Sequence, residues 1–403
     1  MGPLAGLRVI DMTSVVSGPY TTLMLGDYGA DVIKIEAPEG DVVRQAGPER
    51  HKGMGALFLN ANRSKRSITL DLKHRLGQEI VLRLAESADI LVYNIRPAAM
   101  ARLGLAYEPL AARNARLIYA GVFGYGQDGP YAAKPAYDDL IQGAATVPYL
   151  FSRAGTPHPL YLPSALADRV AGLFALSAIL AAVVERASSG KGQRVDIPMF
   201  ESMVNFIMSD HLGGLTFEPP LDAGGYARQL SPQRRPYKTL DGYICTLLYT
   251  DAHWERFFTA VGQAEKLKQD QRFSSFAARM AHIDEVYATL SDILVHKTTK
   301  EWMEILEAAD IPVMPMHDFD SLLKDPHLVA TNYFASVTHP TEGEIKEISV
   351  PTKFFRTPAK STGPAPQQGQ HGYEILQEAG YTEADIDNLA ANKAWQKSAQ
   401  ETT

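Results

Sequence analysis

The sequence predicts an α/β protein built on a largely parallel, doubly wound sheet, followed by a smaller α+β part. One observation is that short apolar strand patterns alternate with helical patterns through the N-terminal half. Another is that a Gly- and Pro-rich stretch, residues 213–236, precedes a second region with strand and helix patterns of its own. The 403 residues are enough for two domains with sizeable cores.

The first half contains five strand patterns, separated by helical ones. A helix is expected from near Ser17 to Gly26, and another from 75 to 87, where apolar residues recur at a 3-4 spacing. Ligands of such sheets bind beyond the carboxyl ends of the strands, so Val15, Asn94 and the 123–138 loop are expected at a binding site. The strand patterns are LRVIDM (7–12), DVIKIE (31–36), SITLDL (67–72), DILVYN (89–94) and RLIYAGV (116–122).

The longest apolar run, Val170–Val184, has 15 residues and charges on both flanks. It is shorter than the roughly 20 residues that span a bilayer, so it predicts a core helix and no membrane partner. Ser164 is its candidate N-cap, and Gly190 and Gly192 are suitable helix stops. A short strand and a helix to about Leu212 should follow.

The second region, 237–330, is expected to be a small α+β domain. It contains the strand YICTLLY (243–249), a helix from Asp251, and helices around 283–295 and 300–308. A hairpin is predicted around Glu342 and Gly343, and Thr382 should cap a closing helix. The expected domains are a large Rossmann-like one (1–212 with 371–403), a linker (213–236), the small one (237–330) and a return linker (331–370).

Composition narrows the class of protein. The net charge of −7 argues against a general nucleic-acid binder. The single cysteine, Cys245, excludes an internal disulfide framework and a cysteine-based zinc cluster, and we expect no metal site. The N-terminus lacks the pattern of a signal peptide, so a cytoplasmic protein is expected.

Asp168 lies in the first turns of the predicted core helix. The helix dipole there should keep its carboxylate ionised near neutral pH. An ionised carboxylate beside apolar packing can act as a nucleophile. The alternative is an acidic residue that only complements the helix terminus.

Residues 124–129, GYGQDG, satisfy the spacing G-x-G-x-x-G after a strand. Pro130 and a polar loop follow, whereas a dinucleotide fingerprint opens a helix in a first βαβ unit. We therefore expect these glycines to let a loop approach a ligand closely.

Several ordered motifs resemble family III of the coenzyme A transferases. The central one combines ADRVAGLFAL (167–176) with RASSGKGQRVDIPMFE (186–201). The N-terminal stretch PLAGLRVIDMTSVVSGPYTTLMLGDYGADVIKIEAPEGD (3–41) agrees with that family almost throughout. NRSKRSITLDLK (62–73) and ADILVYNIRP (88–97) follow in the expected order.

The resemblance implies a reaction at Asp168. In that family an aspartate attacks an acyl-CoA thioester and forms a mixed anhydride. CoA thiolate then gives an aspartyl-CoA thioester, which the acceptor carboxylate opens. Acyl-CoA and a carboxylic acid are thus the expected substrates, with no tightly bound cofactor.

The resemblance also implies a set of CoA contacts. Lys73 and Arg102 suit phosphate oxygens, although both can equally be solvated surface charges. Some family members carry an arginine where this chain has Ala37, and an aromatic residue where it has Ile95. Both differences concern the part of the site that binds the nucleobase of CoA. The matching positions are Val15, Leu70, Lys73, Asn94, Arg102 and Tyr137, with Lys134 weaker; Val15 and Leu70 can also be core residues.

Asp138 matches an acidic residue beside the nucleophile, which either modulates Asp168 or holds the Tyr137 loop. The related α-methylacyl-CoA racemases carry His-Asp where this chain has Tyr137 and Asp138. A tyrosine with a pKa near 10 is a poor base at neutral pH, so racemisation is the second hypothesis. A non-catalytic CoA-binding protein is the third, and Asp168 with Tyr137 argues against it.

Formyl-CoA transferases carry a glycine run where this chain has SPQRRPYKTLDGY (231–243), so formate exchange is not expected. Arg234 or Arg235 is a candidate partner for the second carboxylate of a dicarboxylic acid.

The resemblance finally implies a homodimer of ring-shaped monomers that interlock, in which the small domain of one chain faces the Asp168 pocket of the other.

Overall fold

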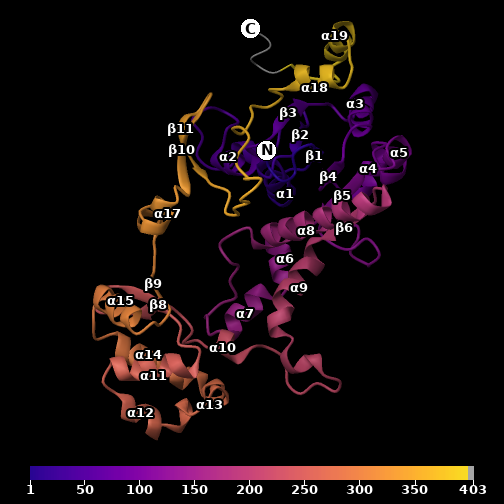
Figure 1. Ribbon diagram of the computed structural model, residues 1–403. Helices are drawn as coiled ribbons and strands as arrows, with labels where there is room; N and C mark the ends of the chain where they lie inside the picture. The colour runs from indigo at the N-terminus through magenta and orange to yellow at the C-terminus, as the bar shows by residue number, and fades with distance from the viewer. Residues whose placement is uncertain (398–403) are drawn as a thin grey trace. The chain divides into compact units, whose positions relative to one another are not determined.

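The computed structural model describes residues 1–397, which form two compact units, each with helices and strands (Figure 1). The first unit comprises Met1–Ala145, Leu162–Phe206 and the chain from His327 onward. The second comprises Thr146–Tyr161 and Ile207–Pro326. The domain and linker boundaries expected from the sequence remain predictions.

Six parallel strands form the central sheet of the first unit. They are β1 (Arg8–Met12), β2 (Asp31–Glu36), β3 (Arg66–Thr69), β4 (Ile90–Tyr93), β5 (Ile118–Phe123) and β6 (Arg194–Pro198). Their order is β3-β2-β1-β4-β5-β6, which confirms the predicted α/β class with a parallel sheet. The strand order reverses between β1 and β4, so a crevice is expected at their carboxyl ends.

Five helices cover one face of the sheet. They are α3 (Arg75–Ala85), α4 (Pro97–Arg102), α5 (Tyr107–Arg113), α18 (Gly372–Glu378) and α19 (Glu383–Ala391). Ile80 and Leu84 of α3 pack in one cluster with Ile10 and Leu91 of the strands. The 3-4 spacing of α3 is therefore the pattern of a buried helix face, as predicted. Thr382 caps α19 in a capping box.

Helices α1 (Ser17–Asp27) and α8 (Leu166–Ser189) pack against each other, and α8 also packs on β5 and β6. Gly172 makes this crossing possible: a Cβ there would lie 3.0 Å from both the Ser17 carbonyl oxygen and the Tyr20 ring. The Thr21 hydroxyl donates to the Gly172 carbonyl at 3.1 Å. The two N-terminal turns thus meet at one edge of the sheet.

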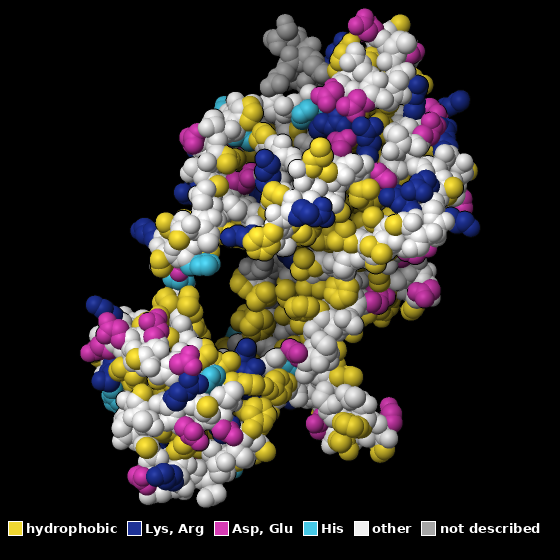
Figure 2. Space-filling view, in the orientation of Figure 1, with side chains coloured by type: hydrophobic (Ala, Val, Ile, Leu, Met, Phe, Trp, Pro, Cys, Tyr) yellow, Lys and Arg dark blue, Asp and Glu magenta, His cyan; other side chains and the backbone are white. Residues whose placement is uncertain are grey.

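By length and composition alone α8 is apolar enough to cross a membrane, a property it shares with core helices. Its contacts with α1, β5 and β6 fit the predicted core helix. Only 44% of its most apolar window is buried, and Leu173, Phe174 and Val184 remain exposed in the single chain. Figure 2 shows a band of hydrophobic side chains over α8.

The predicted N-cap of α8 is wrong by one residue. Ala165 occupies that position without a side-chain cap, and the N–H of Asp168 is instead satisfied by the Asp138 carboxylate, 2.9 Å away. The cap comes from a neighbouring helix, which sequence spacing does not reveal. Gly190 ends α8 at φ 74°, as predicted.

The second unit contains an antiparallel sheet of β7 (Tyr237–Lys238), β8 (Tyr243–Thr246) and β9 (Val313–Pro315). Its core is rich in aromatic residues, with Trp254 and Phe258 of α11 packed on Phe273. Three of its helices agree with the predicted positions: α11 (Asp251–Ala260), α14 (Ile283–Leu294) and α15 (Thr299–Ala308).

The predicted hairpin near Gly343 is confirmed. β10 (Phe334–His339) pairs antiparallel with β11 (Gly343–Ile348), and Gly343 turns at φ 65°. The strand predicted at 67–72 is shorter: β3 ends at Thr69, and Leu70 forms only an isolated bridge with Trp395. The other helices are α2 (Ala56–Asn62), α6 (Asp138–Ala144), α7 (Val147–Arg153), α9 (Met199–His211), α10 (Ala227–Leu230), α12 (Ala264–Gln269), α13 (Phe276–Ala281), α16 (Phe319–Leu322) and α17 (Pro326–Ala330), and 3-10 turns occupy Val42–Gln45, Gly213–Thr216 and Gln271–Phe273.

Candidate active site

A cavity of about 550 Å³ lies in the first unit beyond the carboxyl ends of β1, β4 and β5. This is the position where α/β sheets bind ligands, next to the reversal of strand order. The sequence motifs meet here, although they are far apart in the chain. The lining includes Ser14, Val15, Ser17, Asn94, Tyr137, Asp138 and Asp168.

Asp168 lies in the first turn of α8, half-buried at the wall of this cavity. Ser17, the first residue of α1, lines the same cavity, and its hydroxyl and backbone N–H lower the pKa of Asp168 and so favour the ionised carboxylate. The N-terminal end of α1 carries a partial positive charge, which favours an anion at this place. The carboxylate therefore has local donors and an open cavity beside it.

Opposing effects of its surroundings set the pKa of Asp168. Burial, and then the negative charge of Asp138, raise the pKa of Asp168 to about 6, against the bonds from Ser17 and the charge of Arg169. Burial and the like charge therefore oppose the helix dipole, which was expected to keep this carboxylate ionised near neutral pH. Asp168 is still mostly ionised at pH 7.

Asp138 is itself held in place. It begins α6, and its Oδ2 accepts a hydrogen bond of 2.6 Å from the Gln142 side chain one turn later. Gln142 is fully buried and binds both the N–H and the carbonyl of Leu162, as well as the carbonyl of Ser164. One amide side chain thereby fixes Asp138 and the segment that leads into α8.

The side-chain amide of Asn94, just past β4, forms hydrogen bonds within the protein. Its amide oxygen accepts from the Ser14 N–H at 3.0 Å, and its amide nitrogen donates to the Ser14 carbonyl at 2.8 Å. Asn94 therefore joins the ends of β1 and β4 at the cavity. The neighbouring Val15 has a left-handed conformation, φ 70°.

Residues 4–372 match the family described as CoA-transferase family III. The chain belongs to this family of CoA-transferases.

Relatives of the transferase match over nearly the whole chain. An acyl-CoA transferase of Fusarium pseudograminearum is 34% identical, covering 94% of this chain and 85% of the relative. A succinate–glutarate CoA-transferase of Agrobacterium fabrum is 32% identical, with coverage of 93% and 95%. The crystal structure of a CaiB/BaiF family protein from Brucella suis is 31% identical at a TM-score of 0.78, covering 94% of this chain and 99% of that one.

Family membership shows that the transferase acts on CoA thioesters and carboxylates. This makes the first hypothesis from the sequence, CoA transfer, the one that the comparisons support over racemisation and over non-catalytic binding. The individual steps and residue roles remain predictions.

Three of the expected CoA contacts lie away from the cavity of the transferase. Leu70 is fully buried in the core and pairs with Trp395 through the backbone, so its side chain is a packing residue in the free chain. Lys73 and Arg102 are exposed and do not line the cavity. A long ligand such as CoA extends well beyond one cavity, so their proposed phosphate contacts stay predictions.

Tyr137 lies at the cavity mouth with 70% of its surface exposed, and Lys134 lines the same rim, its ammonium 3.7 Å from the ring centre of Tyr131.

Gly124 has room only for a hydrogen where a Cβ would meet Ala136 at 2.2 Å. Gly124 therefore allows close packing of the cavity loop, and the expected approach of these glycines to a ligand remains a prediction. Ala37 and Ile95 are the two positions that depart from some family members. Ala37 is exposed after β2, and Ile95 packs on the core.

Sequence reasoning missed Ser17 and Gln142 as site residues. Ser17 was expected only as a helix start, although a hydroxyl at a helix N-terminus beside the first strand is a signal for a ligand or carboxylate partner. Gln142 is not marked as a site residue by the sequence, because its partners Leu162 and Ser164 lie 20 and 22 residues away in the chain.

Two other cavities lie away from Asp168, and one of them, of about 490 Å³ in the second unit, is lined by Arg235. The other, of about 580 Å³, lies between α2 and the β10–β11 hairpin and is lined by residues of both. Across residues 1–397, no three or more His, Cys, Asp and Glu side chains come together in a way that could hold a metal ion.

Proposed function

We propose that the transferase moves CoA from an acyl-CoA to a carboxylic acid through covalent intermediates on Asp168. The observation that carries the proposal is a half-buried, mostly ionised carboxylate with Ser17 donors at the wall of the 550 Å³ cavity. A carboxylate that attacks must be ionised and accessible, and its reactive intermediates must be shielded from bulk water.

The reaction needs no reactant other than the acyl-CoA and the acceptor acid. An Oδ of Asp168 attacks the thioester carbonyl, the C–S bond breaks, and CoA leaves as thiolate. The thiolate attacks Cγ of Asp168 and releases the donor acid as carboxylate. The acceptor carboxylate then attacks Cγ of the aspartyl-CoA thioester, and the released thiolate takes the acyl group from the new anhydride.

Several residues have supporting roles in this proposal. Ser17 favours the ionised form of Asp168, and Asp138 opposes it, so the pair sets the pH at which the nucleophile is available. Val15, Asn94 and Tyr137 shape the cavity beside it. Lys73 and Arg102 bind phosphate oxygens of CoA.

We infer that the acceptor is a dicarboxylic acid, since a relative is named a succinate–glutarate CoA-transferase. Arg234 or Arg235 pairs with the second carboxylate. Arg235 lines a cavity of about 490 Å³ in the second unit together with Lys238 and Asp292.

The test is a transfer assay with succinyl-CoA as donor and a set of mono- and dicarboxylic acids, read by mass spectrometry. Wild type should form the CoA ester of at least one acid, and Asp168→Ala should lose at least about a thousandfold in kcat. Asp139→Ala, an exposed carboxylate of α6, is the matched control and should stay near wild type. Transfer by Asp168→Ala at the wild-type rate contradicts the proposal.

The homodimer is a further part of the proposal. The exposed residues Leu173, Phe174 and Val184 on an otherwise apolar α8 support burial by a second copy. In the arrangement that the family resemblance implies, two ring-shaped chains interlock.

A further inference from the structure

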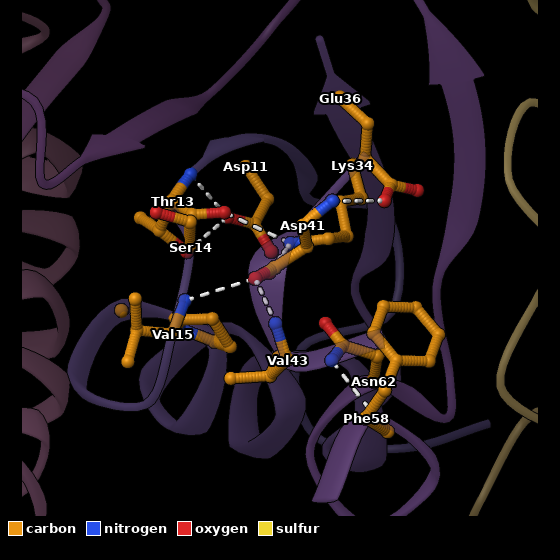
Figure 3. A network of polar contacts seen from close by, with 12 residues as sticks. Asp11, Thr13, Ser14, Val15, Lys34, Glu36, Asp41, Val43, Phe58 and Asn62 are labelled. Atoms are coloured by element: carbon orange, nitrogen blue, oxygen red, sulfur yellow. Dashed lines mark hydrogen bonds and ion pairs between the residues drawn. The ribbon is translucent and has the colours of Figure 1, made fainter. Parts of the chain in front are cut away.

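A buried ion pair contacts Thr13 and Val15 in the loop that joins β1 to α1 (Figure 3). The Lys34 ammonium, from β2, lies 3.0 Å from Oδ2 of Asp41 and donates to the Thr13 carbonyl at 2.8 Å. Oδ1 of Asp41 accepts the N–H of Val15 at 3.2 Å. Both side chains of the pair are almost completely buried.

Other polar groups of residues 13 and 14 are also held by side chains. The Thr13 N–H and hydroxyl both donate to Asp11, and Asn94 binds the N–H and the carbonyl of Ser14. The backbone of the loop is therefore fixed at three successive residues by four side chains, those of Asp11, Lys34, Asp41 and Asn94.

The loop needs such restraint because Val15 is a β-branched residue at φ 70°. That conformation is rare for such a side chain and persists only where the surroundings enforce it. Two residues later, Ser17 begins α1 against Gly172 of α8, lines the same cavity as Asp168 and favours its ionised form. Relaxation of Val15 would displace Ser17 from the Asp168 carboxylate.

We propose that the Lys34–Asp41 ion pair consists of positioning residues for the transfer reaction: it fixes residues 13–15 so that Ser17 faces Asp168. The inference rests on the function proposed above for Asp168. Neither Lys34 nor Asp41 lines the cavity, so they act only through the loop.

A second buried pair provides a matched comparison. Arg63 lies 2.7 Å from Asp27, the last residue of α1, so this pair holds the opposite end of the same helix. Exchange of a buried ion pair for apolar residues of similar size is often tolerated, whereas removal of one partner is strongly destabilising. Double substitutions therefore test the tether with the smallest risk of unfolding.

The experiment compares Lys34→Met/Asp41→Leu with the control Arg63→Met/Asp27→Leu. The readout is the titration of the Asp168 carboxyl carbon by NMR in protein labelled at aspartate, assigned from its loss in Asp168→Asn. Besides Ser17, the groups that act on Asp168 are Asp138 of α6 and Arg169 of α8, with Arg96 and Lys134 on the cavity rim. All of these remain in both variants.

In the Lys34→Met/Asp41→Leu variant the pKa of Asp168 should rise, because the bonds from Ser17 that favour the ionised form are lost. Ser17→Ala should raise it similarly, and combining the two changes should add nothing further. Loss of the nucleophile's alignment should lower kcat/KM at pH 7 by on the order of tenfold to hundredfold. The control should leave the titration and kcat/KM at the wild-type values while its thermal stability falls.

An unchanged Asp168 titration in the folded Lys34→Met/Asp41→Leu variant overturns the proposal, as does an equal shift in the control. Should that variant not fold, Lys34→Met/Asp41→Asn keeps an acceptor for Val15 and removes the Thr13 tether. It should show a smaller rise, and no rise overturns the proposal. The NMR titration does not depend on turnover, so failure of Asp168 as nucleophile, seen in Asp168→Ala, is distinguished from failure of the tether.

Discussion

At the scale of single residues, the reactivity of Asp168 depends on opposing neighbours. Burial and the carboxylate of Asp138 raise its pKa, while Ser17 lowers it, and the outcome is about 6. A carboxylate with a raised pKa is a stronger base and nucleophile but is ionised over a narrower pH range. The value near 6 keeps the ionised form dominant at neutral pH.

Asp138→Asn should lower the pKa of Asp168, because it removes a neighbouring negative charge. Activity needs the ionised form, so the acid limb of the pH profile of kcat/KM should move to lower pH. The Asn amide has only one oxygen for the two donors, Gln142 and the Asp168 N–H, so stability should fall by about 1–3 kcal/mol. Kinetics from pH 4 to 8 and a thermal melt check both; an acid limb at higher pH contradicts the assignment.

Tyr137 stands at the cavity mouth where racemases of related sequence carry histidine. We expect transfer without exchange of the α-proton, since a phenol is a poor base at neutral pH. Incubation of enzyme and an acyl-CoA in deuterated water, followed by mass spectrometry, measures the exchange. Deuterium uptake at a rate equal to CoA transfer would favour racemisation.

The sequence predicts which residues meet at the cavity when they follow strand ends or match a motif. Asp168, Val15, Asn94, Tyr137 and Asp138 line it for that reason. It does not show what the side chains bind, because those partners lie in distant segments. Asn94 was thus expected on CoA, yet both groups of its amide bind Ser14.

At the scale of elements, the site depends on the close crossing of α1 and α8. Ser17 and Thr21 are one turn apart on α1, and Asp168 and Gly172 are one turn apart on α8, so the two helices meet in register at the cavity. Strand and helix positions were predicted well because apolar periodicity records burial. The N-cap of α8 was not, because its cap is a carboxylate from α6.

Gly172→Ala should force α1 and α8 apart, since its Cβ would lie 3.0 Å from the Ser17 carbonyl oxygen. The expected cost is about 1–3 kcal/mol of stability, even though alanine is the better helix former. Displacement of Ser17 should also lower kcat/KM about tenfold. Chemical denaturation and kinetics measure the two effects.

Ser177→Ala, at an exposed position of the same helix, is the control for helix propensity. It should change stability by less than about 0.5 kcal/mol and leave kcat/KM unchanged. A Gly172→Ala variant as active and stable as this control would show that the helices have room to adjust.

At the scale of the whole molecule, the unexplained feature is the exposed apolar surface of α8 (Figure 2). A helix of this composition is stable in water only when most of its surface is covered. The sequence predicts the two groups of secondary structure. It does not predict what covers α8, because no local pattern encodes contacts between chains.

We expect a homodimer that does not separate on dilution. If the two chains interlock, they cannot part without unfolding, and the interface should exceed the roughly 1,600 Å² of ordinary complexes. Sedimentation at nanomolar concentration should show only dimer. A folded monomer that appears reversibly on dilution excludes interlocking.

The central claim is that Asp168 carries the acyl group and then CoA. The most direct measurement is to incubate the enzyme with succinyl-CoA and hydroxylamine and to analyse its peptides by mass spectrometry. The account predicts loss of activity and a hydroxamate on the peptide that contains Asp168, with no such modification in Asp168→Ala. Full activity after this treatment, or a hydroxamate on a different residue, would contradict it.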